Sequence, residues 1–421
     1  MEGQINALQQ EYDNLLRCIR CAACLTSCPT YVTTHKEEEG PRGRIAIMRA
    51  LVEGHLDLTP DAVEHLDNCL LCDACSHICP SGVEMERLGT AFREFKIQNS
   101  EFKKRGLAER FAFGWLFGEL GHFRTAARLV RFYQRSGLQW LARRLGILKL
   151  LGVSEMERLL PPVPGSFVVP KGQRVGAGDP AQVFAGCIMS TAFAPTTERT
   201  VELLAAFGCE NSFPQGQVCC GALQLHAGEA DRARQLARAN IRAFDGEAPI
   251  VVNAAGCGAM LKHYGQLLPD EPAAQAFADR VRDVSELLTC RQPCSPPRPL
   301  ERTVVLQDAC HLLHAQGIVQ APRKLLKAIP GLGLREMAEP GLCCGSAGIY
   351  NVTHQATSAE LQRRKRASIL ATGAQTVVTT NPGCLLQIRA GLPAGIEVRH
   401  IVDVLWEAYG PLTRDRGGRS A

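Results

Sequence analysis

The chain has 421 residues, enough for two or three domains of ordinary size, and its 46% hydrophobic content excludes a disordered or collagen-like polymer. A formal net charge of +5 is too small for a dedicated polyanion binder, and aromatic residues at 6% are too sparse to favour base stacking, so we expect no nucleic-acid partner. The 19 cysteines, an odd number mostly in C-x-x-C and C-C spacings, argue against a disulfide framework and for metal or redox chemistry.

The start of the chain shows neither the basic region nor the apolar core that a secretory signal requires. The longest uncharged stretches, 180–197 and 372–388, are interrupted by Pro, Gly and polar residues, so we expect no membrane-spanning helix. We therefore expect a cytoplasmic chain whose thiols stay reduced. The sequence is also compatible with peripheral attachment to a membrane.

Residues 1–100 are predicted to form one unit with two equal cysteine runs. Each run has the spacing C-x-x-C-x-x-C-x-x-x-C-P, which is that of bacterial ferredoxins. In that pattern three close cysteines of one run and the cysteine before proline of the other run hold one [4Fe–4S] cluster. We therefore predict two clusters, with these ligands: Cys18, Cys21, Cys24 and Cys79 for one, and Cys69, Cys72, Cys75 and Cys28 for the other. Zinc is the alternative metal, but it prefers pairs of thiolates and fits two complete runs poorly.

Residues 101–180 are predicted to connect this unit to the rest of the chain. From Phe102 to Leu151 large apolar residues recur every three or four positions, as amphipathic helices require. The segment 103–149 contains 11 Lys or Arg and only 2 Glu. Its Phe and Trp residues are Phe111, Phe113, Trp115, Phe117, Phe123, Phe132 and Trp140. Such a surface suits an anionic membrane, a partner subunit, a bridge between domains or a plain helical layer, and the residues alone leave these alternatives open.

Residues 181–290 and 301–410 form an internal repeat. Each repeat has a buried strand that runs into a cysteine, a helix, a Cys-Cys-Gly triplet, a second helix and a strand that runs into Gly-Cys. The four cysteines are separated by 32, 1 and 37 residues in the first repeat and by 33, 1 and 40 in the second. Alternating strands and helices predict small parallel sheets with these cysteines at the strand ends.

We expect the four thiolates of each repeat to converge on iron, which gives one or two further iron–sulfur clusters. The predicted ligands are Cys187, Cys219, Cys220 and Cys257 in the first repeat, and Cys310, Cys343, Cys344 and Cys384 in the second. Buried packing is the alternative, and it fits eight cysteines in register poorly. The remaining cysteines have no counterpart in the repeat or lie in a Pro-rich connector, and we expect ordinary thiols at Cys209, Cys290 and Cys294.

Two histidines follow Cys310, and for His311 and His314 we favour a hydrogen bond at a helix start over a role at a cluster. The sequence has no G-x-G-x-x-G, Walker, nucleophile-elbow or H-E-x-x-H motif, so we assign no catalytic residue and expect no oxidation of an organic substrate by this chain alone. The predicted fold class is mixed α+β and α/β: a helical two-cluster ferredoxin-like domain, a helical connector and two pseudo-repeated α/β halves.

The order of these motifs resembles the iron–sulfur subunit family of bacterial glycolate oxidase, and nearly the whole chain takes part, including the segment 40–44 (Gly-Pro-Arg-Gly-Arg). The iron–sulfur subunits of anaerobic glycerol-3-phosphate dehydrogenase and of lactate utilisation are similar. The resemblance implies a subunit that passes electrons from FAD-containing flavoprotein subunits, which oxidise a 2-hydroxy acid, toward a quinone. It also implies peripheral association with the cytoplasmic face of the inner membrane, and it leaves the hydroxy acid unidentified.

One departure separates the chain from the catalytic subunits of heterodisulfide reductase, which its C-terminal half also resembles. In those subunits a further cysteine follows the last cysteine of each repeat, whereas this chain has Met260 and Gln387 there. This argues against a five-cysteine cluster and against disulfide cleavage. The alternatives to an electron-transfer subunit are a self-contained disulfide or quinone reductase and an iron–sulfur sensor, and the sensor would require a nucleic-acid module that the sequence does not show.

Overall fold

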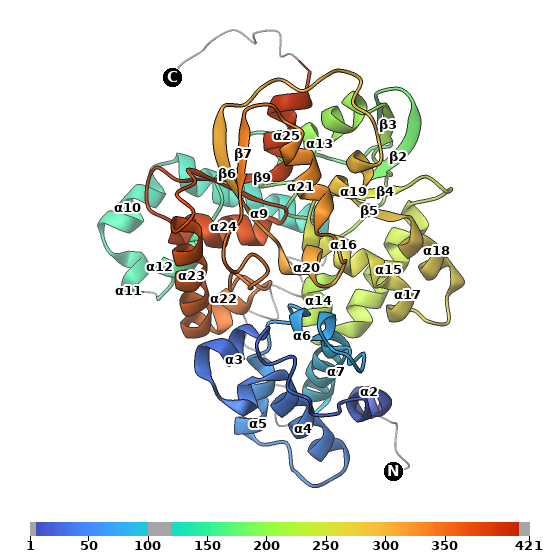
Figure 1. Ribbon diagram of the computed structural model, residues 1–421, viewed down its shortest axis with the longest axis vertical. Coiled ribbons are helices and arrows are strands. Elements are labelled where there is room, and N and C mark those ends of the chain that lie inside the picture. The colour runs from blue at the N-terminus through green and yellow to red at the C-terminus, as the bar shows by residue number, and fades with distance from the viewer. Residues whose placement is uncertain (1–5, 100–118, 151, 412–421) are drawn as a thin grey trace.

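A computed structural model describes residues 6–99, 119–150 and 152–411. A helical N-terminal module lies at one end of the molecule, against a larger body that contains two sheets (Figure 1). The expected mixed α+β and α/β fold is confirmed. No helix within the described ranges is long and apolar enough to cross a membrane.

The N-terminal module is built from short helices around one apolar core. Its core residues include Leu15, Met48, Leu88 and Phe92. The helices are short and several begin at prolines, and all of the module's cysteines except Cys75 lie in the loops between them. The elements are α1 (Ala7–Gln10), α2 (Tyr12–Leu16), α3 (Pro29–Thr34), η1 (Glu37–Glu39), α4 (Pro41–Val52), α5 (Pro60–Asp67), α6 (Ala74–His77) and α7 (Met85–Gln98).

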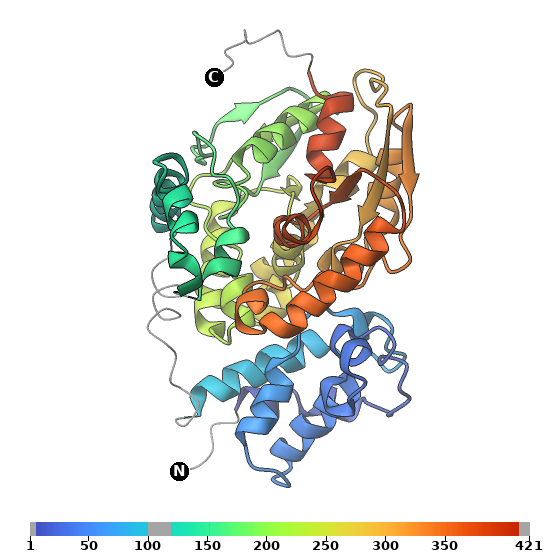
Figure 2. The same ribbon diagram turned by 90° about the vertical axis from the view of Figure 1, so that its left-hand side faces the viewer.

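The connector contains separate helices rather than one long helix. They are α9 (Leu120–Arg135), α10 (Leu138–Arg144), α11 (Ile147–Leu150) and α12 (Ser154–Arg158). The rest of the predicted amphipathic run, 102–118 and 151, lies outside the described residues. In α9, α10 and α11 no residue is fully buried, so these helices lie on the body as an outer layer (Figure 2).

The first repeat forms a sheet with the order β1-β3-β2-β4-β5, in which only β1 is antiparallel to its neighbour. The strands are β1 (Arg174–Val175), β2 (Asp179–Val183), β3 (Cys209–Ser212), β4 (Ile250–Val252) and β5 (Val281–Asp283). The helices are α13 (Ala194–Ala206), α14 (Ala222–His226), α15 (Ala230–Ala243), α16 (Ala255–Lys262), α17 (Tyr264–Leu267), α18 (Pro272–Arg280) and α19 (Val284–Thr289).

The second repeat forms a parallel sheet with the order β7-β6-β8-β9, the same arrangement as β3-β2-β4-β5. The strands are β6 (Arg302–Gln307), β7 (Leu332–Arg335), β8 (Thr376–Thr379) and β9 (Glu397–His400). The helices are α20 (Cys310–Leu313), α21 (Gln320–Lys327), α22 (Tyr350–Thr353), α23 (Gln355–Leu370), α24 (Pro382–Gly391) and α25 (Ile401–Tyr409). The sequence predicts two strands per repeat, and strands β1, β3, β5, β7 and β9 come in addition to them.

The two repeats share one hydrophobic core. Helix α25, at the end of the second repeat, packs against α13 of the first, with Leu204 and Leu405 both buried in the same cluster. Polar contacts reinforce this pairing, since Arg199 pairs with Asp403 at 2.8 Å and lies over the ring of Trp406. The repeats therefore fold as one body.

The N-terminal module packs directly on this body, where α7 meets α14 and α3 meets α23. At Gly228 a Cβ atom would lie 2.5 Å from the carbonyl oxygen of Arg93, so only glycine allows this approach. Arg93 also donates hydrogen bonds to the carbonyl oxygens of His226, at 2.7 Å, and Cys69, at 2.7 Å. These contacts fix the cysteine loops of the module against the body.

Candidate metal centres

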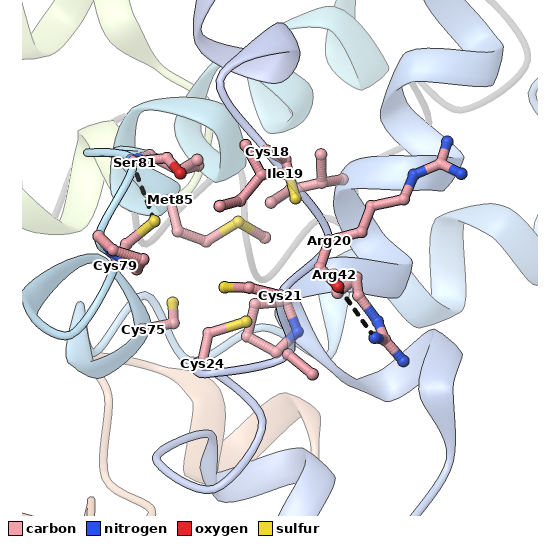
Figure 3. Close-up of a pocket in the computed structure, with 15 residues that line it drawn as sticks. Cys18, Ile19, Arg20, Cys21, Cys24, Arg42, Cys75, Cys79, Ser81 and Met85 are labelled. Carbon is pink, nitrogen blue, oxygen red and sulfur yellow. Dashed lines mark hydrogen bonds between the residues drawn. The ribbon is translucent and has the colours of Figure 1, made fainter.

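The first predicted thiol set of the N-terminal module lines one cavity (Figure 3). Cys18, Cys21 and Cys24 come from the loop after α2, and Cys79 comes from the loop after α6. The loop can turn its thiols inward because Arg20 and Ala22 adopt left-handed backbone conformations, with φ of 58° and 67°. Cys21 is exposed, so this cavity lies at the surface.

The second predicted set lines a second cavity. It contains Cys28, Cys69, Cys72 and Cys75. Leu71 and Asp73 repeat the left-handed conformations of the first loop, with φ of 50° and 61°. Cys75 lines both cavities, so the two sets adjoin.

A buried ion pair stands beside the second set. Arg44 is only 1% exposed and donates hydrogen bonds to Glu39 at 2.9 Å and to Thr30 at 3.0 Å. Burial opposes its charge, but the nearby Cys69 and Cys28 thiols, together with Glu39, raise the pKa of its guanidinium. In the sequence Arg44 is only part of the 40–44 segment, and nothing there points to its position beside the thiols.

The thiols of the second repeat converge as well. Cys310 is the first residue of α20, and Cys343 and Cys344 precede Gly345, whose φ of 85° makes the sharp turn expected for adjacent cysteines. Cys384 lies in the first turn of α24 and accepts a hydrogen bond from Asn381 at 3.5 Å.

The first repeat has the same construction. The Sγ atoms of Cys187 and Cys219 are 3.9 Å apart, and Gly221, with a φ of 89°, follows Cys220. Cys257 lies in the first turn of α16. The predicted position at strand ends needs correction for Cys257 and Cys384, because a helix begins between the strand and each of these cysteines.

Burial and neighbouring groups shift the pKa values of several of these thiols. Burial raises the pKa of Cys24 to about 11, and it raises those of Cys72 and Cys75 well above the usual value. In the second repeat a hydrogen bond with Cys343 lowers the pKa of Cys310 to about 7, and the charge of His311 acts in the same direction. Since thiolates are the metal-binding form, each cavity offers buried sulfur ligands that a cation would hold deprotonated.

A buried cation distinguishes the two repeats. Lys365 on α23 is 1% exposed, and its ammonium group donates to the carbonyl oxygens of Glu339 at 2.6 Å and Pro340 at 3.2 Å. Burial lowers its pKa, while the charges of the nearby Cys344 and Cys343 thiols raise it. The corresponding position of the first repeat is Asn240, a neutral amide that donates to the carbonyl oxygen of Cys219 at 3.0 Å.

The remaining cysteines lie elsewhere. Cys209 is buried in the core of the first sheet, while Cys290 and Cys294 are exposed. Met260 and Gln387, which stand where the heterodisulfide reductase subunits have a further cysteine, are both buried, and Gln387 donates to Ser358 at 3.0 Å.

The histidines after Cys310 make the expected hydrogen bonds. His314 donates to the carbonyl oxygen of Gly341 at 3.1 Å, and His311 donates to that of Leu71 at 2.8 Å. The second bond reaches across to the N-terminal module, a contact that the sequence does not reveal.

Family models match most of the chain. The 4Fe-4S dicluster domain matches residues 14–83, and the cysteine-rich domain matches residues 181–262 and 304–389. The linker region of the glycolate oxidase iron–sulfur subunit matches residues 104–160. These matches and the clustered thiols confirm the expected iron–sulfur cofactors.

Relatives cover nearly the full length. The chain is 38% identical to the probable glycolate oxidase iron–sulfur subunit of Bacillus subtilis strain 168, over 98% of this chain and 99% of the relative. It is 29% identical to the glycolate oxidase iron–sulfur subunit of Escherichia coli K12, over 97% of each chain. It is also similar, at 28% identity over 95% of this chain and 73% of the relative, to a fumarate reductase (CoM/CoB) polypeptide of Methanothermobacter marburgensis.

Proposed function

Since the chain belongs to the family of glycolate oxidase iron–sulfur subunits, we propose that it carries electrons within a complex that oxidises a 2-hydroxy acid, glycolate first among them. The observation that carries this proposal is the continuous arrangement of four thiol sets through the molecule. The oxidation itself belongs to FAD-containing flavoprotein subunits of the complex, because this chain has no flavin or nicotinamide motif.

The proposed ligand sets are the four groups of thiols described above. In the N-terminal module, Cys79 joins the three close cysteines of the first run, and Cys28 joins those of the second run. The lining of the two cavities supports this exchange of the fourth ligand between the runs. When bound, an iron–sulfur cluster supplies reversible uptake of one electron, with a potential set by burial, charge and hydrogen bonds. The protein's own contribution is to fix the order of the sets and the charges beside them.

Contacts between the sets support one order. The two sets of the N-terminal module share Cys75 at their common wall. Cys72 lies in one hydrophobic cluster with Cys343, and Cys310 packs against that cluster. Cys257 of the first repeat packs against the cluster that contains Cys344. The sets therefore follow one another from the module, through the second repeat, to the first repeat.

The two ends of this order differ in their surroundings. The first cavity of the module is open at Cys21 and flanked by Arg20 and Arg42, and we assign this end to the flavoprotein. At the other end, the linker is tied to the loop after Cys187. The backbone N–H of Val168 in the linker donates to the carbonyl oxygen of Ser190 in that loop at 2.9 Å. The connector helices lie along this body, so we place the acceptor, a quinone, on their side (Figure 2).

The connector offers a surface for an anionic membrane. Its exposed apolar side chains are Leu129, Phe132, Leu138, Trp140, Leu141, Leu145, Ile147 and Leu150. Exposed Arg128, Arg135, Arg144 and Lys149 accompany them on the same helices. A basic, apolar helical surface of this kind binds in the plane of an anionic interface, and we propose that it holds the complex at the cytoplasmic face of the inner membrane.

Purification of the native complex tests the function. The proposal expects flavin-containing subunits to copurify with this chain and glycolate, rather than L-lactate or glycerol 3-phosphate, to reduce an artificial acceptor fastest. If glycolate is inactive while lactate or glycerol 3-phosphate is oxidised, the substrate assignment is wrong but the role as an electron carrier stands. Turnover of a disulfide or quinone by the isolated chain would instead identify a self-contained reductase.

A further inference from the structure

A group of non-cysteine ligands lies where the three parts of the protein meet. Glu86 comes from α7 of the N-terminal module, His226 from α14 of the first repeat and His311 from α20 of the second repeat. One ligand atom from each lies within 4.8 Å of the other two. None of these residues belongs to a thiol set, and the electron-transfer proposal gives the group no role.

The orientation of His311 is that of a metal ligand. Its Nε2 donates to the carbonyl oxygen of Leu71 at 2.8 Å, so Nδ1 is the ring nitrogen that a metal ion would occupy. Metal-binding histidines commonly donate their other ring N–H to a backbone carbonyl in this way. The rings of His226 and His311 lie with their centroids 5.8 Å apart, and His226 Nε2 lies 3.2 Å from Glu86 Oε1.

The charges of the group also suit a cation. Burial alone would raise the pKa of Glu86, but the hydrogen bond with His226 and the nearby histidine charges lower it to about 2, so the carboxylate is ionised. Burial lowers the pKa of His226, so a cation readily replaces its proton and takes over the stabilisation of the Glu86 carboxylate.

A fourth side chain adds an independent observation. Asp73 Oδ1 is buried, and among the described residues it has no hydrogen-bond partner. Asp73 and Glu86 line the same cavity, so the two carboxylates lie close together. A buried carboxylate oxygen without a donor is costly unless water or a cation satisfies it.

We propose that Glu86, His226 and His311 bind one divalent first-row metal ion of the Zn²⁺ type, with Asp73 completing the site directly or through water. Two imidazoles and one carboxylate are an established three-ligand set for zinc, whose bonds to nitrogen and oxygen are roughly 2.0–2.2 Å long. The ligand atoms need only a small side-chain adjustment to converge on one ion. Because each ligand comes from a different part of the protein, the ion ties the N-terminal module to both repeats and holds the thiol sets of Cys72 and Cys310 at a fixed separation.

Zinc binding to the full chain with its iron–sulfur clusters in place tests the proposal. The protein is treated anaerobically with a mild chelator, equilibrated with Zn²⁺, desalted, and analysed for zinc and iron by elemental mass spectrometry. We expect one zinc per chain with unchanged iron, and a rise of Tm on zinc addition. His226→Gln and Glu86→Gln should each weaken zinc binding more than about tenfold and abolish the rise of Tm.

His314→Gln is the matched control, because His314 lies three residues after His311 but outside the group, and it should bind zinc like the unaltered protein. Unchanged iron content shows that each variant has folded and that zinc has not replaced iron at the thiols. The proposal is overturned if the unaltered protein retains no zinc, or if both variants retain it with unaltered affinity.

Discussion

Among single residues, those with a charge beside a thiol set are expected to affect the reduction potential of a cluster bound there. A cluster bound by four thiolates is negatively charged, so a buried cation stabilises its reduced state and raises its potential. Lys365 supplies such a charge to the second repeat, and Asn240 at the corresponding place of the first repeat does not. The fold therefore makes two similar sites electrically different.

Replacement of Lys365 by Gln should lower the reduction potential of the second-repeat cluster by roughly 80–130 mV. A unit charge roughly 5–8 Å away contributes about 2–3 kcal/mol at an effective dielectric constant near 20, and about 1.4 kcal/mol corresponds to about 59 mV for a one-electron couple. A redox titration followed by electron paramagnetic resonance measures this shift. Arg363→Gln is the control, because Arg363 lies on the same helix but is 71% exposed. Equal potentials in the Lys365 variant and the unaltered protein would show that the ammonium group does not tune the cluster.

The convergence of the cysteines could be predicted from the sequence because regular short spacings bring their thiols to the same place. Lys365 could not, because it stands among Arg363, Arg364 and Arg366 and has the pattern of a solvated helix face. Only the packing of α23 against the loop at Glu339 and Pro340 buries it. The roles of Arg44 and His311 escaped prediction for the same reason, since their partners are distant in the sequence.

Among the elements, the Cys-Cys-Gly turn decides whether each repeat forms its own site. Cys344→Ser should remove the iron of the second repeat and spare that of the first, because the turn at Gly345 serves only its own set. Iron and sulfide analysis of the full chain measures the loss, with Cys294→Ser as an exposed-cysteine control. Loss of iron from both repeats together would mean that the two sites are not independent, and no loss would exclude Cys344 as a ligand.

The connector helices are the element that we expect to contact the membrane. A combined Arg135→Glu, Arg144→Glu and Lys149→Glu variant should bind anionic vesicles at least about tenfold more weakly, since each juxtamembrane basic residue contributes about 1 kcal/mol. Cosedimentation with vesicles that contain phosphatidylglycerol measures binding, and neutral vesicles provide the control. If the variant sediments like the unaltered protein, or if neither binds, the helices form only a structural layer.

The repeat order of strand, helix and Cys-Cys-Gly could be predicted from the sequence, but five of the nine described strands could not. Strands β3 and β7 are four residues long and alternate in burial, with the sequences CENS and LGLR, so they lack the apolar runs that mark β6 and β8. They form because a neighbouring parallel strand pairs with them. The helix starts before Cys257 and Cys384 escape prediction when the apolar strand is extended to the following Gly-Cys, although Asn381-Pro382 is typical of a helix start.

At the scale of the whole molecule, the N-terminal module and the two repeats are assembled so that four thiol sets form one series. The hydrophobic cluster that contains Cys72 and Cys343, against which Cys310 packs, joins the module to the body, and the shared core of α13 and α25 joins the repeats. Sequence spacing predicted the membership of each set. The order of the sets depends on tertiary packing, and no spacing in the chain encodes it.

Electron delivery by the assembled complex tests this series most directly. Cys72→Ser breaks it between the two ends, and Cys21→Ser breaks it at the exposed end, while Cys209→Ser alters a buried thiol outside the series. With glycolate, the first two variants should still show reduction of the partner's flavin but should pass electrons to the quinone at less than about a hundredth of the unaltered rate, and Cys209→Ser should keep that rate. Quinone reduction at the unaltered rate in both cluster variants would contradict the account.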